Sequence, residues 1–369
     1  MTMQSCPVNR NGSERRSRSS FATRCCASDG RCIDLLSGTR YRGRVARLTP
    51  VEELLVAAVG PVFPAAQLVV VDGGKCVLER AVGAATTSTR FDLASLTKPL
   101  CTVALAARLM EQGALSSTTR PRPDCTVAQL LAHAGGLPGW RALGDPQKPS
   151  EKMRAKVIEA ARAEPAEYPA GTRSVYSDLG YILLGDAIER AAGERLDTLF
   201  AREIAGELGV ELGYPPVSGE LAPTEGVLRG IVHDENARAM GGVAGHAGLF
   251  GDAHAVSLLV AAWVDAFHGD GTLLDSPWVQ RAWANAGIPG STWGLGWDHP
   301  SATASSAGER WPKTGVGHLA FTGCSIWIDP PKRRWVILLS NRVYPTRANE
   351  AIKAFRPRLH DSIVAALDD

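Results

Sequence analysis

Apolar residues recur at helical spacing through the middle of the chain, whereas segments rich in β-branched residues lie near its two ends. The helical pattern covers residues 49–59, 95–112, 126–134, 150–163, 178–192, 253–267 and 347–367. The strand pattern covers residues 67–71, 75–80, 324–328 and 335–340. We therefore expect strands early and late in the chain, with helices filling the region between them.

Short signals at the ends of these segments indicate how they connect. Thr49-Pro50-Val51-Glu52 has the form of a capping box with proline at the first helical position, which predicts the start of the first helix. Asp72-Gly73-Gly74 separates the first two strands and predicts a hairpin, which argues against a repeating β-α-β unit. The simplest fold is α/β (α+β): one antiparallel sheet built from both chain ends, flanked by helices, with an all-helical region inserted.

The composition is that of a globular protein and excludes several classes. The 369 residues are 45% hydrophobic and 21% charged, which excludes a wholly disordered or collagen-like chain. The net charge of +2 is too balanced to indicate a nucleic-acid or membrane surface, and no run of about 18 apolar residues predicts a membrane span. The hydrophobic segment of a secretory signal is absent, so we expect a cytoplasmic protein, or an extracytoplasmic one if the start is misassigned.

The first 48 residues differ from the rest in charge and cysteine content. They contain ten arginines, no lysine and three acidic residues, a net charge of +7, together with four of the eight cysteines. We expect residues 1–48 to be a disordered basic extension, although a nucleic-acid arm or a metal-binding knuckle fits the same composition. Residues 49–369 would form the folded domain, with a sheet part at about 49–94 and 300–369 and a helical part at about 95–299. Four further cysteines are expected to be reduced and mostly buried: Cys76, Cys101, Cys125 and Cys324.

Ser95 and Lys98 form the first candidate for chemistry. Ser95 lies where strand-like sequence gives way to a helical pattern, and Lys98, three residues later, would lie on the same helical face. A serine hydroxyl is a weak nucleophile until a base takes its proton. Burial and the positive end of a helix could lower the lysine pKa enough to make it that base. The alternative interpretation is a helix cap followed by a surface lysine.

Tyr176-Ser177-Asp178, which precedes a predicted helix, is the second candidate. A tyrosine near a lysine can relay a proton, as base during acylation and as acid for the leaving group. The alternative is a packing tyrosine followed by a helix cap at Ser177 or Asp178. We expect Asp178 to have the capping role in either case.

The third candidate is Gly315–Gly323, a glycine-rich stretch that leads into a predicted strand. His318, Ala320 and Thr322 would alternate onto one face of that strand, and the glycines would let a substrate backbone approach closely. The alternative is an ordinary glycine-rich strand entry with a surface histidine.

Together these motifs resemble those of the serine β-lactamase and penicillin-binding-protein superfamily. Ser95/Lys98, Tyr176-Ser177-Asp178 and His318-Leu319-Ala320 occur in the order typical of that superfamily, separated by 81 and 142 residues. The chain is most similar to class C β-lactamase-related hydrolases of the DD-peptidase and carboxylesterase branch. The resemblance covers about residues 50–367 and implies a β-lactamase/transpeptidase-like fold, with the site between sheet and helical region. Similar supporting stretches are residues 126–138, 242–250, 293–297 and 341–343.

The resemblance implies a role for each matched residue. Ser95 would be the acylated nucleophile, Lys98 would activate it, and Tyr176 would relay protons. His318 would stand in the place of the lysine of the family's Lys-Thr-Gly strand motif. The backbone N–H groups of Ser95 and Phe321 would form the oxyanion hole, and neither a cofactor nor a metal ion would be needed.

The residues that would bind the substrate depart from the family's pattern. Asp178 stands where asparagine is usual and adds a negative charge. Leu319-Ala320 replaces Thr-Gly, which removes a hydroxyl that would bind a substrate carboxylate and adds a methyl group. A neutral His318 at pH 7 would weaken anion binding further. Because β-lactams carry a carboxylate, we expect a neutral ester or amide to be the better substrate.

Other residues are weaker candidates. Asp234-Glu235 could be a carboxylate pair for glycoside chemistry, but the side chains of adjacent residues point apart on any regular element. Gly241–Gly245 lacks the features of a phosphate or dinucleotide loop, and we expect it to pass close beneath the active site. The histidine spacing matches no metal motif for His133, His233, His246 and His254. Three tryptophans would either wall a substrate cleft or pack in the core: Trp140, Trp293 and Trp297.

We expect a serine hydrolase that forms an acyl-enzyme on Ser95 and hydrolyses an ester or amide of a small molecule or peptide. It would act as an esterase, a DD-peptidase-like enzyme or a weak β-lactamase. The alternative from another class is a non-catalytic penicillin-binding or sensor module on the same fold. A third interpretation, nucleic-acid binding through the Arg-rich extension, is not favoured. The sequence leaves the substrate and the oligomeric state open.

Overall fold

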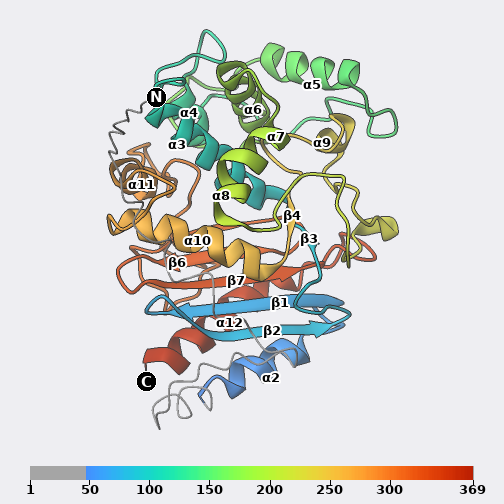
Figure 1. Cartoon of the computed structure of the whole chain (residues 1–369), viewed down its shortest axis with the longest axis vertical. Coiled ribbons are helices and arrows are strands. Elements are labelled where there is room, and N and C mark those ends of the chain that lie inside the picture. The colour runs from blue at the N-terminus through green and yellow to red at the C-terminus, as the bar shows by residue number, and fades with distance from the viewer. Residues whose placement is uncertain (1–46, 369) are drawn as a thin grey trace, which may run out of the picture.

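The structure is a computed structural model that describes residues 47–368. Its main sheet has five antiparallel strands in the order β2-β1-β7-β6-β5 and lies between two layers of helices (Figure 1). The strands are β1 (Ala65–Asp72), β2 (Lys75–Gly83), β5 (Val316–Leu319), β6 (Ser325–Asp329) and β7 (Arg334–Ser340). β1 and β2 form the predicted hairpin. β1 also pairs with β7, with Leu68 opposite Leu338. The prediction of one sheet built from both chain ends is therefore confirmed.

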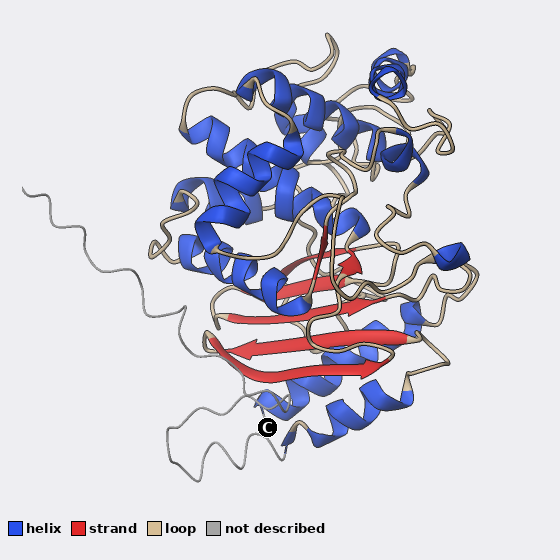
Figure 2. Ribbon diagram, turned by 45° about the vertical axis from the view of Figure 1, so that its right-hand side comes forward, coloured by secondary structure: helices blue, strands red, loops and turns tan. Residues whose placement is uncertain are grey.

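Both faces of the sheet are covered, because alternate residues of the central strands point to opposite sides. Val69 and Ile337 pack with the helical region, where α10 (Ala253–Phe267) contacts β1 and β7. Leu68 and Leu338 pack on the opposite side with α2 (Thr49–Ala57) and α12 (Ile352–Asp368). Figure 2 shows the resulting layers, with the sheet between α2 and α12 on one side and the larger group of helices on the other.

The chain between β2 and β5 is mainly helical. Its helices are α3 (Ala104–Glu111), α4 (Val127–Leu131), α5 (Glu151–Ala163), α6 (Asp178–Ala192), α7 (Leu196–Phe200), α8 (Gly206–Leu208), α9 (Glu235–Ala239), α10 and α11 (Ser276–Trp283). Its shorter turns are η1 (Ala94–Leu96), η2 (Lys98–Val103), η3 (Ala201–Ala205) and η4 (Glu225–Val227). A two-stranded pair, β3 (Phe91–Asp92) with β4 (Phe250–Gly251), also lies within this part of the chain.

One predicted helix cap and two predicted helix ends are wrong, each for a local reason. The chain is already helical at Leu48, so Thr49 lies inside α2 and makes no capping hydrogen bond; a capping side chain needs an extended backbone. The helix predicted over 126–134 ends at Leu131, because His133 has a left-handed backbone. α12 begins at Ile352 rather than near 347, since the Asn349 side chain accepts from the Ala351 N–H in the preceding turn.

Of the four cysteines that are described, Cys101, Cys125 and Cys324 are free thiols in buried positions, as predicted, and Cys76 is partly exposed. The extension predicted for residues 1–48 lies outside the described residues except for its last two positions. Within the described range 47–368, no helix is both long and apolar enough to cross a membrane.

Candidate active site

Ser95 lies in a tight turn that directly follows β3. Ala94 has a φ of +43°, and its N–H donates to Asp92 Oδ1 at 2.8 Å. A left-handed backbone strains a residue with a side chain, and such strain occurs often at functional sites. The 3-10 turn η1 and the π-helical turn η2 then lead into α3. This irregular start leaves Ser95 partly exposed, whereas both of its neighbours are buried.

Lys98 is fully buried next to Ser95. Its Nζ lies 3.2 Å from Ser95 Oγ, 2.9 Å from the carbonyl oxygen of His246 and 2.6 Å from Asp178 Oδ1. Burial alone would lower the pKa of Lys98, but the Asp178 carboxylate overrides it, and the pKa is raised above its ordinary value. Lys98 Nζ thus donates to the His246 carbonyl and to Ser95 Oγ, and it forms an ion pair with Asp178.

Tyr176 completes this cluster, with its phenol next to Lys98 and Ser95. The Lys98 ammonium also lies 4.9 Å from the centre of the Tyr176 ring. Burial raises the pKa of the Tyr176 phenol, and the neighbouring Lys98 charge partly opposes that rise. The structure thus brings together a hydroxyl, an amine and a phenol that sequence analysis singled out from two distant motifs.

Ser177, rather than Asp178, caps α6. Ser177 Oγ accepts from Gly180 N at 3.2 Å and donates to the Pro138 carbonyl at 2.7 Å. The prediction that Asp178 caps this helix is wrong, because Asp178 is already the first residue inside α6. Its carboxylate instead forms the ion pair with Lys98.

The third motif spans a strand and a turn rather than one strand face. His318 lies in β5, which ends at Leu319, and Ala320 N donates to the Cys324 carbonyl to close the turn to β6. The predicted alternation of His318, Ala320 and Thr322 along a single strand is therefore wrong. Thr322 Oγ1 donates to the backbone oxygen of Asp92 at 2.9 Å, which ties this turn to the segment just before Ser95.

His318 is buried and neutral. Its Nδ1 lies 2.8 Å from the Leu319 carbonyl and must donate to it, so Nε2 carries the lone pair. Burial, together with the Lys98 charge, lowers the pKa of His318 to about 3. Nε2 has no hydrogen-bond partner among the described residues. A neutral ring with a free acceptor suits an N–H or O–H donor better than a carboxylate.

Phe321 lies on the turn that follows β5. β5 contacts η1, the turn that carries Ser95. The Phe321 carbonyl accepts from Arg342 Nε at 2.8 Å, which fixes the peptide group that follows Phe321. The Phe321 ring is 47% exposed and stacks on His233 with the ring centres 5.6 Å apart. An exposed aromatic ring therefore stands at the edge of the candidate site.

Sequence analysis missed how Asp234 and His246 support Lys98. His246 Nε2 lies 2.7 Å from Asp234 Oδ1, and the His246 carbonyl accepts from Lys98. Burial would raise the pKa of Asp234, but the His246 ring overrides it and holds that pKa below its usual range. The Gly245 carbonyl accepts from Thr102, which lies in η2 together with Lys98.

One remaining candidate, Trp293, lies in the site, with its ring centre 5.6 Å from that of Tyr176 and 5.5 Å from that of His318. Glu235 pairs with Arg347 while Asp234 pairs with His246, so the two carboxylates point apart as predicted. Trp297 is fully buried in the core, whereas Trp140 is 46% exposed. Across residues 47–368, no group of three or more His, Cys, Asp or Glu side chains is placed to hold a metal ion.

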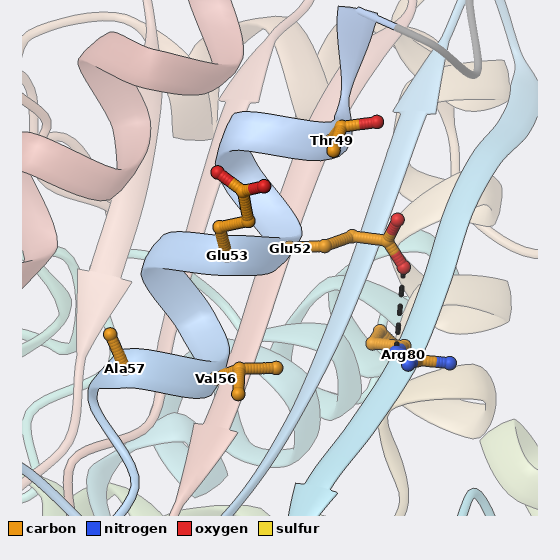
Figure 3. A pocket seen from close by; sticks show the side chains of 6 residues that line it. All are labelled: Thr49, Glu52, Glu53, Val56, Ala57 and Arg80. Atoms are coloured by element: carbon orange, nitrogen blue, oxygen red, sulfur yellow. Dashed lines mark ion pairs between the residues drawn. The ribbon is translucent and has the colours of Figure 1, made fainter.

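A shallow surface depression of about 430 Å³ lies away from these residues, between α2 and the edge strand β2 (Figure 3). Its polar contact is the ion pair between Arg80 Nε and Glu52 Oε1, which are 3.4 Å apart. It contains none of the candidate residues and lies on the side of the sheet covered by α2.

A relative and two solved structures resemble this chain over most of its length. A protein of Escherichia coli K12 named "Putative D-alanyl-D-alanine carboxypeptidase" is 27% identical, over 81% of this chain and 83% of its own. The hydrolase EstCE1, described as having promiscuous acyltransferase activity, superimposes with a TM-score of 0.69 at 18% identity, over 89% of this chain and 100% of its own. A penicillin-binding protein homologue of Caulobacter crescentus superimposes with a TM-score of 0.66 at 20% identity, over 88% of this chain and 97% of its own.

Because the two solved structures are less than 25% identical to this chain, their similarity shows the fold alone. The mixed α/β fold with an antiparallel sheet is shared with β-lactamase and penicillin-binding-protein-like structures. The family model named Beta-lactamase matches residues 51–356. That range includes Ser95, Lys98, Tyr176 and the third motif. The chain belongs to the beta-lactamase family.

Proposed function

We propose that this protein is a serine hydrolase that forms an acyl-enzyme on Ser95 and hydrolyses an ester or amide. The observation that carries the proposal is the distance of 3.2 Å between Ser95 Oγ and Lys98 Nζ, with the Tyr176 ring centre 4.9 Å from the same amine. Ser95 is partly exposed while Lys98 is buried. A substrate can therefore reach the hydroxyl while the amine that activates it is kept from water.

In the first step, Ser95 Oγ attacks the substrate carbonyl and its proton passes to Lys98 in its neutral form. The His246 carbonyl and Asp178 hold that amine next to the hydroxyl. The N–H groups of Ser95 and Phe321 stabilise the oxyanion. Tyr176 relays the proton to the leaving alcohol or amine as the acyl bond breaks. Water then attacks the carbonyl of the acyl-enzyme, the same groups take its proton, and that proton passes to Ser95 Oγ as the acyl bond to Ser95 breaks.

The charges around the cluster support a substrate with no carboxylate beside the reacting bond. Asp178 adds a negative charge next to Lys98, and neutral His318 offers an acceptor instead of a cation. Ala320 has no hydroxyl with which to hold an anion. An esterase or amidase activity on neutral compounds follows from these three residues. A D-alanyl-D-alanine carboxypeptidase activity is the second candidate, supported by the name of the E. coli relative.

Steady-state turnover of three substrates tests the proposal: a p-nitrophenyl ester, a D-Ala-D-Ala peptide and a cephalosporin. We expect Ser95-dependent hydrolysis that is fastest with the neutral ester. Faster cleavage of the peptide would favour the second candidate. Equal rates for the wild-type protein and Ser95→Ala would contradict the proposal. Binding of all three compounds without turnover would instead favour a non-catalytic binding module.

A further inference from the structure

Tyr176 lies on a segment that belongs to no helix or strand. Residues 173–177 precede α6 without regular structure, so neither a sheet ladder nor a helix fixes the phenol next to Ser95 and Lys98. The segment lies instead on the stretch 132–139. Ser174 Oγ donates to the Ala132 carbonyl, and Asp178 N donates to the Gly139 carbonyl.

His133 contacts this segment on both sides of Tyr176. Its backbone carbonyl accepts from Val175 N at 2.9 Å. Its ring Nδ1 accepts from Ser177 N at 3.1 Å. The His133 and Tyr176 rings are also in contact, with their centres 4.5 Å apart and an angle of 35° between them. One residue thus holds the main chain before and after Tyr176 and packs against its ring.

The backbone and the charge state of His133 both suit this task. His133 has a φ of +55°, a left-handed conformation at the point where the chain leaves α4. Accepting at Nδ1 requires a neutral ring that carries its proton on Nε2. Burial, with the nearby Lys98 charge, lowers the pKa of His133 well below its ordinary value and so keeps the accepting form. His133 is 1% exposed, and its Nε2 has no hydrogen-bond partner in the described part of the chain.

We propose that His133 is the positioning residue for Tyr176. It accepts hydrogen bonds from the main chain on both sides of the tyrosine and thereby holds the phenol next to Ser95 and Lys98. This inference rests on the proposed function, since it assigns a task within the same site. His133 itself makes no contact with Ser95. Its effect on the reaction therefore passes through Tyr176.

A matched pair of variants distinguishes the effect of the hydrogen-bond acceptor of His133 from the effect of the size of its ring. His133→Asn keeps an acceptor near the Nδ1 position, and asparagine tolerates a left-handed backbone. His133→Leu has nearly the same shape as the asparagine variant but cannot accept. His133→Gly removes the acceptor without backbone strain, and so keeps the test available if the leucine variant does not fold. Tyr176→Phe serves as the reference for loss of the phenol.

The measurement is the rate at which a fluorophosphonate probe labels Ser95, together with amide exchange at Ser177. We expect the leucine and glycine variants to label about 10- to 100-fold more slowly, because a misplacement of about 1 Å costs this much. The asparagine variant should stay within about threefold of the wild type. The Ser177 amide should exchange faster in the leucine and glycine variants alone. In a Tyr176→Phe background, His133→Leu should add less than about twofold.

Suppose that the wild-type protein is labelled on Ser95 but the asparagine and leucine variants are labelled at equal rates. That result overturns the inference and leaves the proposed function standing. An additive loss in the Tyr176→Phe background also overturns it, since His133 would then act by another route. If the wild-type protein shows no Ser95-dependent labelling, the proposed function fails and the inference fails with it.

Discussion

On the sheet side of the candidate site, His318 is placed by a backbone ladder, with β5 paired to β6 and His318 opposite Ile326. On the helical side, Tyr176 lies on an irregular segment that is held largely by side chains, among them His133 and Ser177. A ladder made of backbone groups survives most changes of side chain, whereas contacts made by side chains do not. We therefore expect substitutions on the helical side to disturb the chemistry, and substitutions on the sheet side to disturb stability or substrate choice.

The largest effect is expected from Lys98→Met, which keeps an apolar chain of similar length but removes the amine. Acylation of Ser95 should slow by about 10³-fold, because the hydroxyl loses the group that takes its proton. Rapid-mixing kinetics with a p-nitrophenyl ester measure this rate. A loss of less than about tenfold would mean that Tyr176 alone suffices as base, and the assignment of Lys98 would be wrong.

Leu338→Ala in β7 gives the contrasting result on the sheet side. Leu338 is fully buried between the sheet and the layer of α2 and α12, so its truncation should cost about 3 kcal/mol of unfolding free energy. The turnover rate per folded molecule should remain unchanged. Urea unfolding and active-site titration measure the two quantities separately. A large fall in turnover with intact folding would remove the contrast between the two sides.

Asp92 connects the two sides, since its carboxylate bonds to the Ala94 and His233 N–H groups and its carbonyl accepts from Thr322. Burial raises the pKa of Asp92 to about 6, against an ordinary 3.8. The folded state therefore binds this proton more tightly than the unfolded state, and its contribution to stability falls as pH rises from about 4 to about 6. The loss amounts to at most about 3 kcal/mol.

Asp92→Asn should remove this pH dependence, although it also loses one acceptor and is less stable overall. Urea unfolding of both proteins at several pH values gives the difference between their free energies of unfolding. The contributions of the other titrating groups cancel in that difference. The wild-type protein should lose stability relative to Asp92→Asn as pH rises from about 4 to about 6. A constant difference across that range would contradict the assignment.

Asp178→Asn should have the smallest effect and should sharpen the account of substrate choice. Asp178 raises the pKa of Lys98, so its removal lets the amine lose its proton more easily. The rising limb of the pH–rate profile, which reports the neutral amine, should move to lower pH. Removing the negative charge should also improve turnover of a cephalosporin relative to a neutral ester by about tenfold. An unchanged ratio would show that Asp178 does not select against carboxylates.

The parts of the site that the sequence predicts are those with a local signal. Ser95 and Lys98 are three residues apart at a helix start, and His318 lies in a glycine-rich stretch before a strand. The hairpin of β1 and β2 also follows from local turn chemistry. The pairing of β1 with β7 needed only the argument that strands at both chain ends must share one sheet.

The parts that the sequence does not predict depend on contacts between distant elements. Lys98 is held by the carbonyl of His246, 148 residues away; every residue has a carbonyl, so no residue type marks this contact. Asp178 looks like a helix cap in sequence and forms an ion pair in the structure, because Lys98 approaches it from another element. The His133 ring accepts a hydrogen bond from Ser177 N, 44 residues away, and the left-handed backbone of His133 has no signal in the sequence.

Covalent labelling by a fluorophosphonate, read by intact mass and peptide mapping, tests the central claim most directly. The account predicts a single adduct on Ser95, absent from Ser95→Ala and formed much more slowly by Lys98→Met. An adduct on any other residue, or equal labelling of Ser95→Ala, would contradict the claim that Ser95 is the activated nucleophile.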